Sequence, residues 1–164
     1  MEKNNRKRII LIGRSAAGKT TLCQYLNRQE LRYCKTQTIH IINKEMIDTP
    51  GEYLERRNFW GALMVASVDA EVIVFVQDAT ESGTMFPPAY SSMFAKPIIG
   101  VVTKSDLADG QQLEVAAKYL KMAGAAQIFI TSSVNGSGFE GLCEALGYIQ
   151  EMHCADYVME EGSV

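Results

Sequence analysis

Residues 13–20 read Gly13-Arg14-Ser15-Ala16-Ala17-Gly18-Lys19-Thr20 and fit the pattern G-x-x-x-x-G-K-[ST] without a mismatch. The two glycines let the backbone turn tightly, so that successive N–H groups point inward and form an anion-binding site at a helix N-terminus. In such a loop the lysine reaches the β- and γ-phosphates of a nucleotide, and the threonine hydroxyl binds Mg²⁺. These residues therefore predict a phosphate-binding loop, with Lys19 as its cation and Thr20 as a metal ligand.

The sequence on either side supports this interpretation. Residues 8–12 are an apolar run typical of a buried strand that ends at the loop, and residues 21–26 are typical of the helix that follows it. At average residue usage, a chain of this length would match the pattern by chance on the order of 1% of the time. The strand–loop–helix context makes a chance match rarer still.

Five further strands are predicted, at residues 38–42, 46–48, 71–77, 98–103 and 127–131. The apolar runs within 71–77 and 98–103 are continuous rather than alternating, as in parallel strands that are covered on both faces. Helices are predicted at residues 56–68, 111–122 and 139–153. This alternation predicts a doubly wound α/β fold with a mostly parallel six-stranded sheet and one antiparallel edge pair, joined by a tight turn at residues 43–44.

Each of these helices carries an apolar stripe that we expect to pack on the sheet. The stripes are Trp60, Leu63, Met64, Ser67 and Val68 in the first, Leu113, Ala116, Ala117 and Leu120 in the second, and Phe139, Leu142, Leu146 and Ile149 in the third. The segment 78–96 is rich in Gly, Pro and apolar residues, and predicts a short helix after Pro88. Its apolar side chains either cover the sheet or form a patch for a partner.

The composition is that of one globular domain, with 164 residues, 47% of them hydrophobic, and a formal net charge of −3. That charge gives no reason to expect a nucleic-acid partner, and no apolar run is long enough to span a membrane, so a cytoplasmic location is expected. Four cysteines without a C-x-x-C pair and two histidines indicate free thiols and no structural metal.

We expect a flexible basic N-terminus at 1–7, a single domain at 8–153 and a frayed acidic tail at 154–164. The basic N-terminus is either simply solvated or a docking tag.

Two more motifs follow predicted strands, at the edge where such sheets bind ligands. The first is Asp48-Thr49-Pro50-Gly51, in which Asp48 can hold Mg²⁺ through water and the Gly51 N–H can sense a γ-phosphate. Alone, this D-x-x-G pattern is equally typical of a simple turn. After a phosphate-binding loop, it indicates a nucleotide-dependent switch.

The other of these two motifs is Thr103-Lys104-Ser105-Asp106. A carboxylate aimed at a purine accepts hydrogen bonds from N1–H and N2–H₂, which guanine has and adenine lacks. Asp106 therefore predicts guanine selection, with Lys104 packing over the base, unless the segment is only a polar turn. Ser132 and Ser133 follow the last strand, where a backbone N–H would contact the guanine O6.

In this order, the elements resemble the Ras-like (TRAFAC-type) small GTPases, over roughly residues 8–150. More narrowly, the short span from Lys19 to Asp48, the segment Lys35-Thr36-Gln37-Thr38 and the segments 47–54 and 101–107 resemble the ethanolamine-/propanediol-utilisation P-loop family (EutP/PduV). The resemblance implies a three-layer P-loop NTPase fold of Ras-like type. It also implies an association with bacterial microcompartments, with shell proteins or an activating protein as partners.

The chain departs from the wider GTPase pattern at two positions. Thr103 stands where an Asn usually braces the phosphate loop, which predicts weaker affinity with guanine selectivity kept. Glu52 stands where Ras-like proteins carry a water-orienting Gln, so we expect slow intrinsic hydrolysis, with Glu52 either accepting a proton from water or simply facing solvent.

Thr36 and Thr38 can both supply the first-switch ligand to Mg²⁺, and Thr36 is preferred. Arg14 is expected to be exposed rather than on the phosphates.

Three functions remain open at this point. The first is a Mg²⁺-dependent GTPase that binds GTP and GDP and acts as a slow switch. The second, implied by the resemblance, is an acetate kinase using ATP, for which Arg56 and Arg57 are the available phosphoryl-clamping residues. The third is a nucleotide-holding assembly module with negligible turnover.

The candidate nucleotide contacts are Gly13, Arg14, Ser15, Ala16, Ala17, Gly18, Lys19, Thr20, Thr21, Thr103, Lys104, Asp106, Ser132 and Ser133. The candidate catalytic residues are Lys19, Thr36, Gly51 and Glu52, and the candidate metal ligands are Thr20, Thr36 and Asp48.

Overall fold

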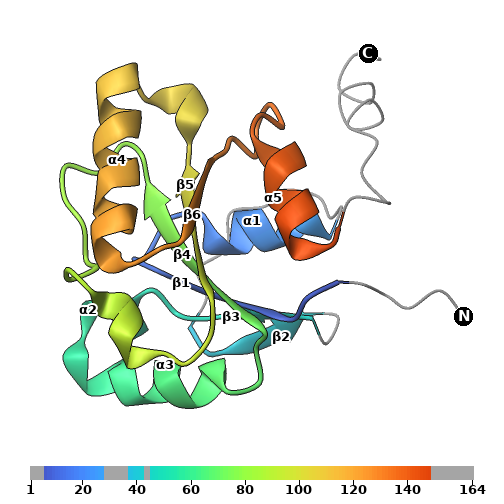
Figure 1. The fold of residues 1–164 in the computed structure, drawn as a ribbon, viewed down its shortest axis with the longest axis vertical. Helices are drawn as coiled ribbons and strands as arrows, with labels where there is room; N and C mark the ends of the chain where they lie inside the picture. The colour runs from blue at the N-terminus through green and yellow to red at the C-terminus, as the bar shows by residue number, and fades with distance from the viewer. Residues whose placement is uncertain (1–5, 28–36, 43–44, 149–164) are drawn as a thin grey trace, which may run out of the picture.

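A six-stranded sheet forms the centre of the protein, for which a computed structural model describes residues 6–27, 37–42 and 45–148 (Figure 1). The strand order is β2-β3-β1-β4-β5-β6, with β2 antiparallel to β3 and every other pair parallel. The strands are β1 Ile9–Gly13, β2 His40–Ile42, β3 Met46–Asp48, β4 Val72–Asp78, β5 Ile98–Thr103 and β6 Gln127–Ile130. The predicted mostly parallel sheet with one antiparallel edge pair is confirmed.

Helices cover both faces of this sheet. They are α1 Lys19–Leu26, α2 Glu52–Glu55, α3 Trp60–Ser67, α4 Gly110–Ala123 and α5 Phe139–Leu146, with 3₁₀ turns at Arg57–Phe59, Tyr90–Met93 and Ser105–Leu107. In β1, Ile9 and Leu11 pack with α1 and α5 in one core, whereas Ile10 and Ile12 pack with α2, α3 and α4 in the other. This alternation of side chains gives the three layers that were expected.

The central strands are covered on both faces. Every residue of β4 and β5 is buried, which confirms the prediction from their continuous apolar runs. Gly100 in β5 allows α4 to lie close, because a Cβ there would come within 3.0 Å of Leu120 Cδ1.

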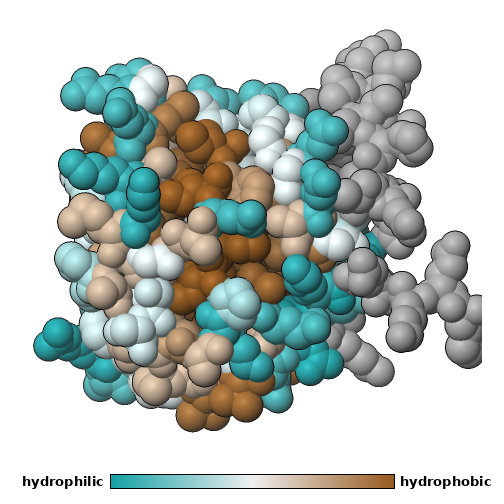
Figure 2. Space-filling view, viewed as in Figure 1, coloured by the Kyte–Doolittle hydropathy of each residue, from teal (hydrophilic) through white to brown (hydrophobic). Residues whose placement is uncertain are grey.

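The predicted helix at 56–68 is wrong as a single element. Arg56 has extended dihedrals (φ −116°, ψ 118°) that separate α2 from the 3₁₀ turn, and α3 begins only at Trp60. Leu63 and Ser67 face the sheet as expected, but Met64 and Val68 are 42% and 68% exposed. Each of them follows a buried residue, Leu63 or Ser67, by one position and so lies further around the helix, and Figure 2 shows hydrophobic surface over α3 at the lower edge of the molecule.

The predicted helix at 139–153 is too long. Helix α5 ends at Leu146, because Gly147 adopts a left-handed conformation (φ 78°) and the Tyr148 N–H turns back to donate to Cys143 O. Residues 149–153, with the predicted stripe member Ile149, lie outside the described residues, as do the turn at 43–44 and the tail at 154–164.

The segment between β4 and β5 covers the sheet, as one of the two sequence interpretations predicted. Phe86 and Tyr90 are buried, and both rings pack against Phe75 of β4. The 3₁₀ turn Tyr90–Met93 stands where a short helix was expected after Pro88. Met85 stays 39% exposed at the rim of this cover.

Helix α4 is fixed at both ends by residues next to it in the chain. The Asp109 side chain accepts from Gln112 N, and the Gln112 side chain accepts from Asp109 N, which is a complete capping box. Gly124 ends the helix in a left-handed conformation (φ 105°). Within the described ranges, none of the helices has the length and apolar character needed to cross a bilayer.

Candidate functional site

The loop at residues 13–18 joins β1 to α1 at the carboxyl edge of the sheet. Its turn depends on left-handed backbone at Ala16 (φ 62°) and Gly18 (φ 96°). Ala16 adopts this conformation despite its Cβ, which is uncommon for a residue other than glycine. The Gly18 carbonyl accepts from Leu22 N as the helix begins. The geometry is that of a phosphate-binding loop that leads directly into a helix N-terminus.

Lys19 is buried at the base of this loop, with only 5% of its surface exposed. Its Nζ donates to Gly13 O at 2.8 Å and to Arg14 O at 2.9 Å. Burial lowers the pKa of Lys19 to about 8, although the charges of Asp48 and Glu55 act in the opposite direction. The amine is therefore held inside the loop and largely stripped of water, where a phosphate would interact with it strongly.

Thr20 and Asp48 meet across the start of α1 and the end of β3. Thr20 Oγ1 donates to Asp48 Oδ2 at 2.6 Å, and Asp48 is 1% exposed. A hydroxyl and a carboxylate are the oxygen donors that Mg²⁺ takes, with waters completing its octahedron, so these residues fit the ion. Thr36, the preferred third ligand, lies outside the described residues, and Thr38 is exposed.

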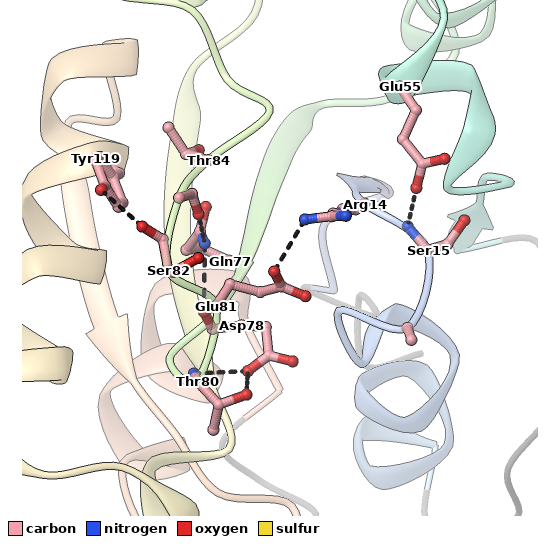
Figure 3. Close-up of polar contacts among 12 residues, drawn as sticks. Arg14, Ser15, Glu55, Gln77, Asp78, Thr80, Glu81, Ser82, Thr84 and Tyr119 are labelled. Atoms are coloured by element: carbon pink, nitrogen blue, oxygen red, sulfur yellow. Dashed lines mark hydrogen bonds and ion pairs between the residues drawn. The ribbon is translucent and has the colours of Figure 1, made fainter.

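Gly51 brings the motif Asp48-Thr49-Pro50-Gly51, the second motif along the chain after the phosphate loop, directly onto that loop. A Cβ at Gly51 would lie 2.1 Å from Ser15 N, so only glycine allows this approach. Helix α2 follows at once, with the half-buried Glu52 as its first residue. Four residues after Gly51, Glu55 Oε1 accepts from Ser15 N at 2.8 Å (Figure 3).

The other flank of the loop is held by Arg14. Its guanidinium donates to Glu81 Oε2 at 2.9 Å, and both side chains are part-exposed. Figure 3 shows Glu55 and Glu81 reaching adjacent loop residues from two different segments. Arg14 thus lies at the surface, as expected.

The motif Thr103-Lys104-Ser105-Asp106 is tied to the phosphate loop by two side chains. Lys104, in left-handed backbone (φ 59°), donates from Nζ to Ala16 O at 2.8 Å and to Asp78 Oδ2 at 2.6 Å. Thr103 Oγ1 donates to Ala17 O at 2.5 Å. Thr103 therefore contacts the phosphate loop itself, and the weaker affinity expected of a threonine at this position stays a prediction.

Asp106 is positioned by the segment that follows β6. Ser132, fully buried, donates from Oγ to Asp106 Oδ1 at 2.8 Å. Asp106 lies at an exposed position, two residues after Lys104. Ser133 is half-buried in the same turn, whereas Thr21 lies within α1.

Sequence reasoning missed three carboxylates that hold this site together: Glu55, Asp78 and Glu81. A signal existed for Asp78, because it ends a strand at the ligand-binding edge just as Asp48 does. Its Oδ1 accepts from Thr80 N and Thr80 Oγ1, while its other oxygen binds Lys104. Glu55 and Glu81 gave no such signal, because their partners are 40 and 67 residues away in the chain.

The space beside the loop is small. A cavity lined by Arg14, Leu54, Gln77, Glu81 and Phe86, among others, has about 10 Å³ free for the centres of water molecules. That volume suits roughly one water molecule.

We predict that Gly51→Ala forces the second motif away from the phosphate loop, because its new methyl group would overlap Ser15. The expected loss in the free energy of unfolding is about 1–3 kcal/mol. Urea unfolding measures it. Gly61→Ala in α3 is the matched control, since a Cβ there meets nothing within 4 Å. The control should be neutral or stabilising by up to about 1 kcal/mol. Equal stability of both variants would contradict the close approach.

Comparison with known proteins identifies relatives of this chain. The model of a protein family described as "Ethanolamine utilisation - propanediol utilisation" matches residues 6–148. The propanediol utilization protein PduV of Citrobacter freundii is 40% identical over 134 residues, which cover 82% of this chain and 89% of PduV. A protein of Escherichia coli named "Probable acetate kinase EutP" is 33% identical over 104 residues, and the match spans 63% of this chain and 65% of EutP.

Among solved structures, the bacterial selenocysteine-specific elongation factor EF-Sec superposes with a TM-score of 0.64 at 21% identity. The match covers 89% of this chain but only 29% of EF-Sec. At this identity the likeness establishes the fold alone. That fold is the three-layer P-loop architecture expected from the sequence.

Proposed function

The chain belongs to the PduV–EutP family of ethanolamine and propanediol utilisation proteins. On that premise, we propose that it is a Mg²⁺-dependent guanine nucleotide-binding protein that hydrolyses GTP slowly. The observation that carries the proposal is the joining of the base motif to the phosphate loop. Lys104 contacts Ala16 O, Thr103 contacts Ala17 O, and Asp106 is fixed by Ser132. One nucleotide could therefore meet the loop with its phosphates and Asp106 with its base.

Each residue then has a defined role. Lys19 neutralises the β- and γ-phosphates, and Asp106 accepts from the N1–H and N2–H₂ of guanine. Thr20 and Asp48 hold Mg²⁺, which would supply charge neutralisation of the phosphates. The Gly51 N–H senses the γ-phosphate. Glu52 replaces the amide that would orient the attacking water, and its charge is repelled by the triphosphate, so turnover is slow.

Calorimetric titration of purified protein with GTP, GDP and ATP, each with Mg²⁺, tests the proposal. We expect GTP and GDP to bind at least about a hundredfold more tightly than ATP, because a site built around hydrogen bonds rejects a base that cannot make them. Comparable or tighter ATP binding would overturn guanine selection. It would make the kinase alternative the leading one.

We predict that triphosphate affinity falls with rising pH above about pH 8, the pKa of Lys19 in the free protein. Below that pH the amine already carries its proton, so it adds no pH dependence. Above it, binding must take up a proton, because the anionic phosphates raise the pKa of Lys19 in the complex. The dissociation constant should rise by up to about tenfold per pH unit. Titrations in buffers of different ionisation enthalpy measure the proton uptake directly. Affinity that is level from pH 7 to 9.5 would contradict it.

An acetate kinase is the second candidate, favoured by the name of the EutP relatives. One observation weighs against it. Arg57 lies over the Trp60 ring at 5.3 Å, an alternative use for one of the two expected clamping residues. Formation of acetyl phosphate from ATP and acetate by the purified protein would favour this function over the first.

The third candidate is an assembly module that holds nucleotide without turning it over. It would work in the cytoplasm on a bacterial microcompartment, with shell proteins or an activating protein as partners and residues 1–8 as the docking segment. GTP binding without measurable hydrolysis, together with loss of docking on removal of residues 1–8, would favour it.

A further inference from the structure

Glu55 places an anion of the protein itself on the phosphate-binding loop. Ser15 is the third residue of that loop, and the backbone N–H groups of such loops are the donors that bind phosphate oxygens. The donor is taken by Glu55 Oε1 at 2.8 Å (Figure 3). Burial acts to raise the pKa of Glu55, but hydrogen bonds from Ser15 and the charges of Arg14 and Lys19 outweigh it and hold that pKa below its ordinary value. The carboxylate is therefore bound as an anion.

The contact lies on the side of the loop that faces the second motif. Gly51 abuts Ser15, and Glu55 follows Gly51 by a single helical turn in α2. The N–H of Gly51 is the group assigned to the terminal phosphate. A γ-phosphate that approached Gly51 would therefore come close to Ser15 N and to the Glu55 carboxylate.

Two anions cannot share this donor without a cost. Like charges a few ångströms apart disfavour each other's ionised form, although water screens part of the effect at an exposed residue such as Glu55. A nucleoside diphosphate ends before the position that Gly51 senses, and its β-phosphate is met by Lys19 and Thr20. Glu55 thus opposes the triphosphate far more than the diphosphate.

We propose that Glu55 is a specificity-determining residue that occupies the site of the terminal phosphate and shifts the preference of the protein toward nucleoside diphosphate. The inference rests on the proposed function, since it assumes that the loop binds a nucleotide. It adds a physical consequence, because a γ-phosphate that displaces Glu55 also frees the C-terminal end of α2 from the loop.

The test compares GTP and GDP by calorimetry with Mg²⁺ in the wild type, Glu55→Gln and Glu55→Ala. Removing one charge-assisted hydrogen bond at an exposed site should tighten GTP binding by about three- to tenfold and leave GDP within about twofold. Glu114→Gln on the exposed face of α4 makes the same charge change elsewhere and should alter neither affinity.

A second readout needs no nucleotide. In nucleotide-free protein, amide hydrogen exchange in a peptide spanning residues 13–18 should be faster in Glu55→Ala than in the wild type, because the Ser15 N–H loses its acceptor. Unchanged exchange would overturn the contact, and an unchanged ratio of GTP to GDP affinity would overturn its role in selectivity.

The failure of this inference and that of the proposed function give different results. If the wild type binds guanine nucleotides but the Glu55 variants keep its GTP-to-GDP ratio, only the role of Glu55 is wrong. If the wild type prefers adenine nucleotides, guanine selection is wrong, and the ATP-to-ADP ratio of the same variants decides the role of Glu55. If no nucleotide binds, both proposals fail.

Discussion

Lys19→Ala is expected to abolish tight binding of nucleoside triphosphate. The amine is 5% exposed and lies between Gly13 O and Arg14 O, so it meets the phosphates as a desolvated cation already in place. Truncating one partner of a buried charge pair typically costs about 2–5 kcal/mol, and we expect a loss of affinity of about a hundredfold or more. Calorimetric titration with GTP and Mg²⁺ measures the loss.

Lys118→Ala is the matched control, because Lys118 is an exposed lysine of α4 far along the chain from the loop. It should bind GTP like the wild type. Circular dichroism should show both variants folded, since Lys19 is a buried cation whose removal relieves a desolvation cost. Wild-type affinity in Lys19→Ala would mean that the loop does not hold phosphate.

Asp106→Asn should exchange the preference for GTP for one for xanthosine triphosphate. Xanthine carries a carbonyl where guanine carries its N2 amine, so the amide of asparagine can donate where the carboxylate accepted. Ser132 Oγ can still hydrogen-bond to the asparagine carbonyl, which keeps the side chain in place. The ratio of the affinity for GTP to that for xanthosine triphosphate should change by about a hundredfold or more, because guanine becomes the mismatched base and xanthine the matched one.

Asp109→Asn, three residues further on, provides the control. It removes the same charge from the same region, and asparagine caps a helix about as well as aspartate does. Competition of xanthosine and guanosine triphosphates for one fluorescent nucleotide gives the ratio for all three proteins. If Asp106→Asn keeps the wild-type ratio, Asp106 has a structural role only.

Strands and the phosphate loop could be predicted from sequence because their signals are local. The bounds of β3 and β5 agree with the predicted 46–48 and 98–103, since continuous apolar runs and the polar motif that ends each of them mark both limits. Asp48, Thr103 and Asp106 were predicted to meet at one edge from the rule that parallel strands end together. Thr20 and Asp48 do lie in contact.

The segment at residues 51–68 could not be predicted in the same way. Its apolar spacing favours one continuous helix over 56–68, but Gly51 and Glu55 bind the loop at Ser15 and leave a separate turn, α2, before the extended Arg56. Contacts between residues so far apart in the chain leave no periodicity to read. The early end of α5 is a different case, because Gly147 was a visible stop signal.

The capping of α4 bears on how the chain folds. Asp109, Gln112 and Gly124 hold that helix through contacts within or beside it, so its order requires no distant partner. The sheet, in contrast, pairs residues such as Ile9 and Val72, and each parallel pairing closes a long loop at an entropic cost. Local elements of this kind form faster than non-local strand pairs. We therefore expect α4 to be ordered early in folding, and the nucleotide site, which needs β3, β1, β4 and β5 paired in one sheet, to be completed among the last steps.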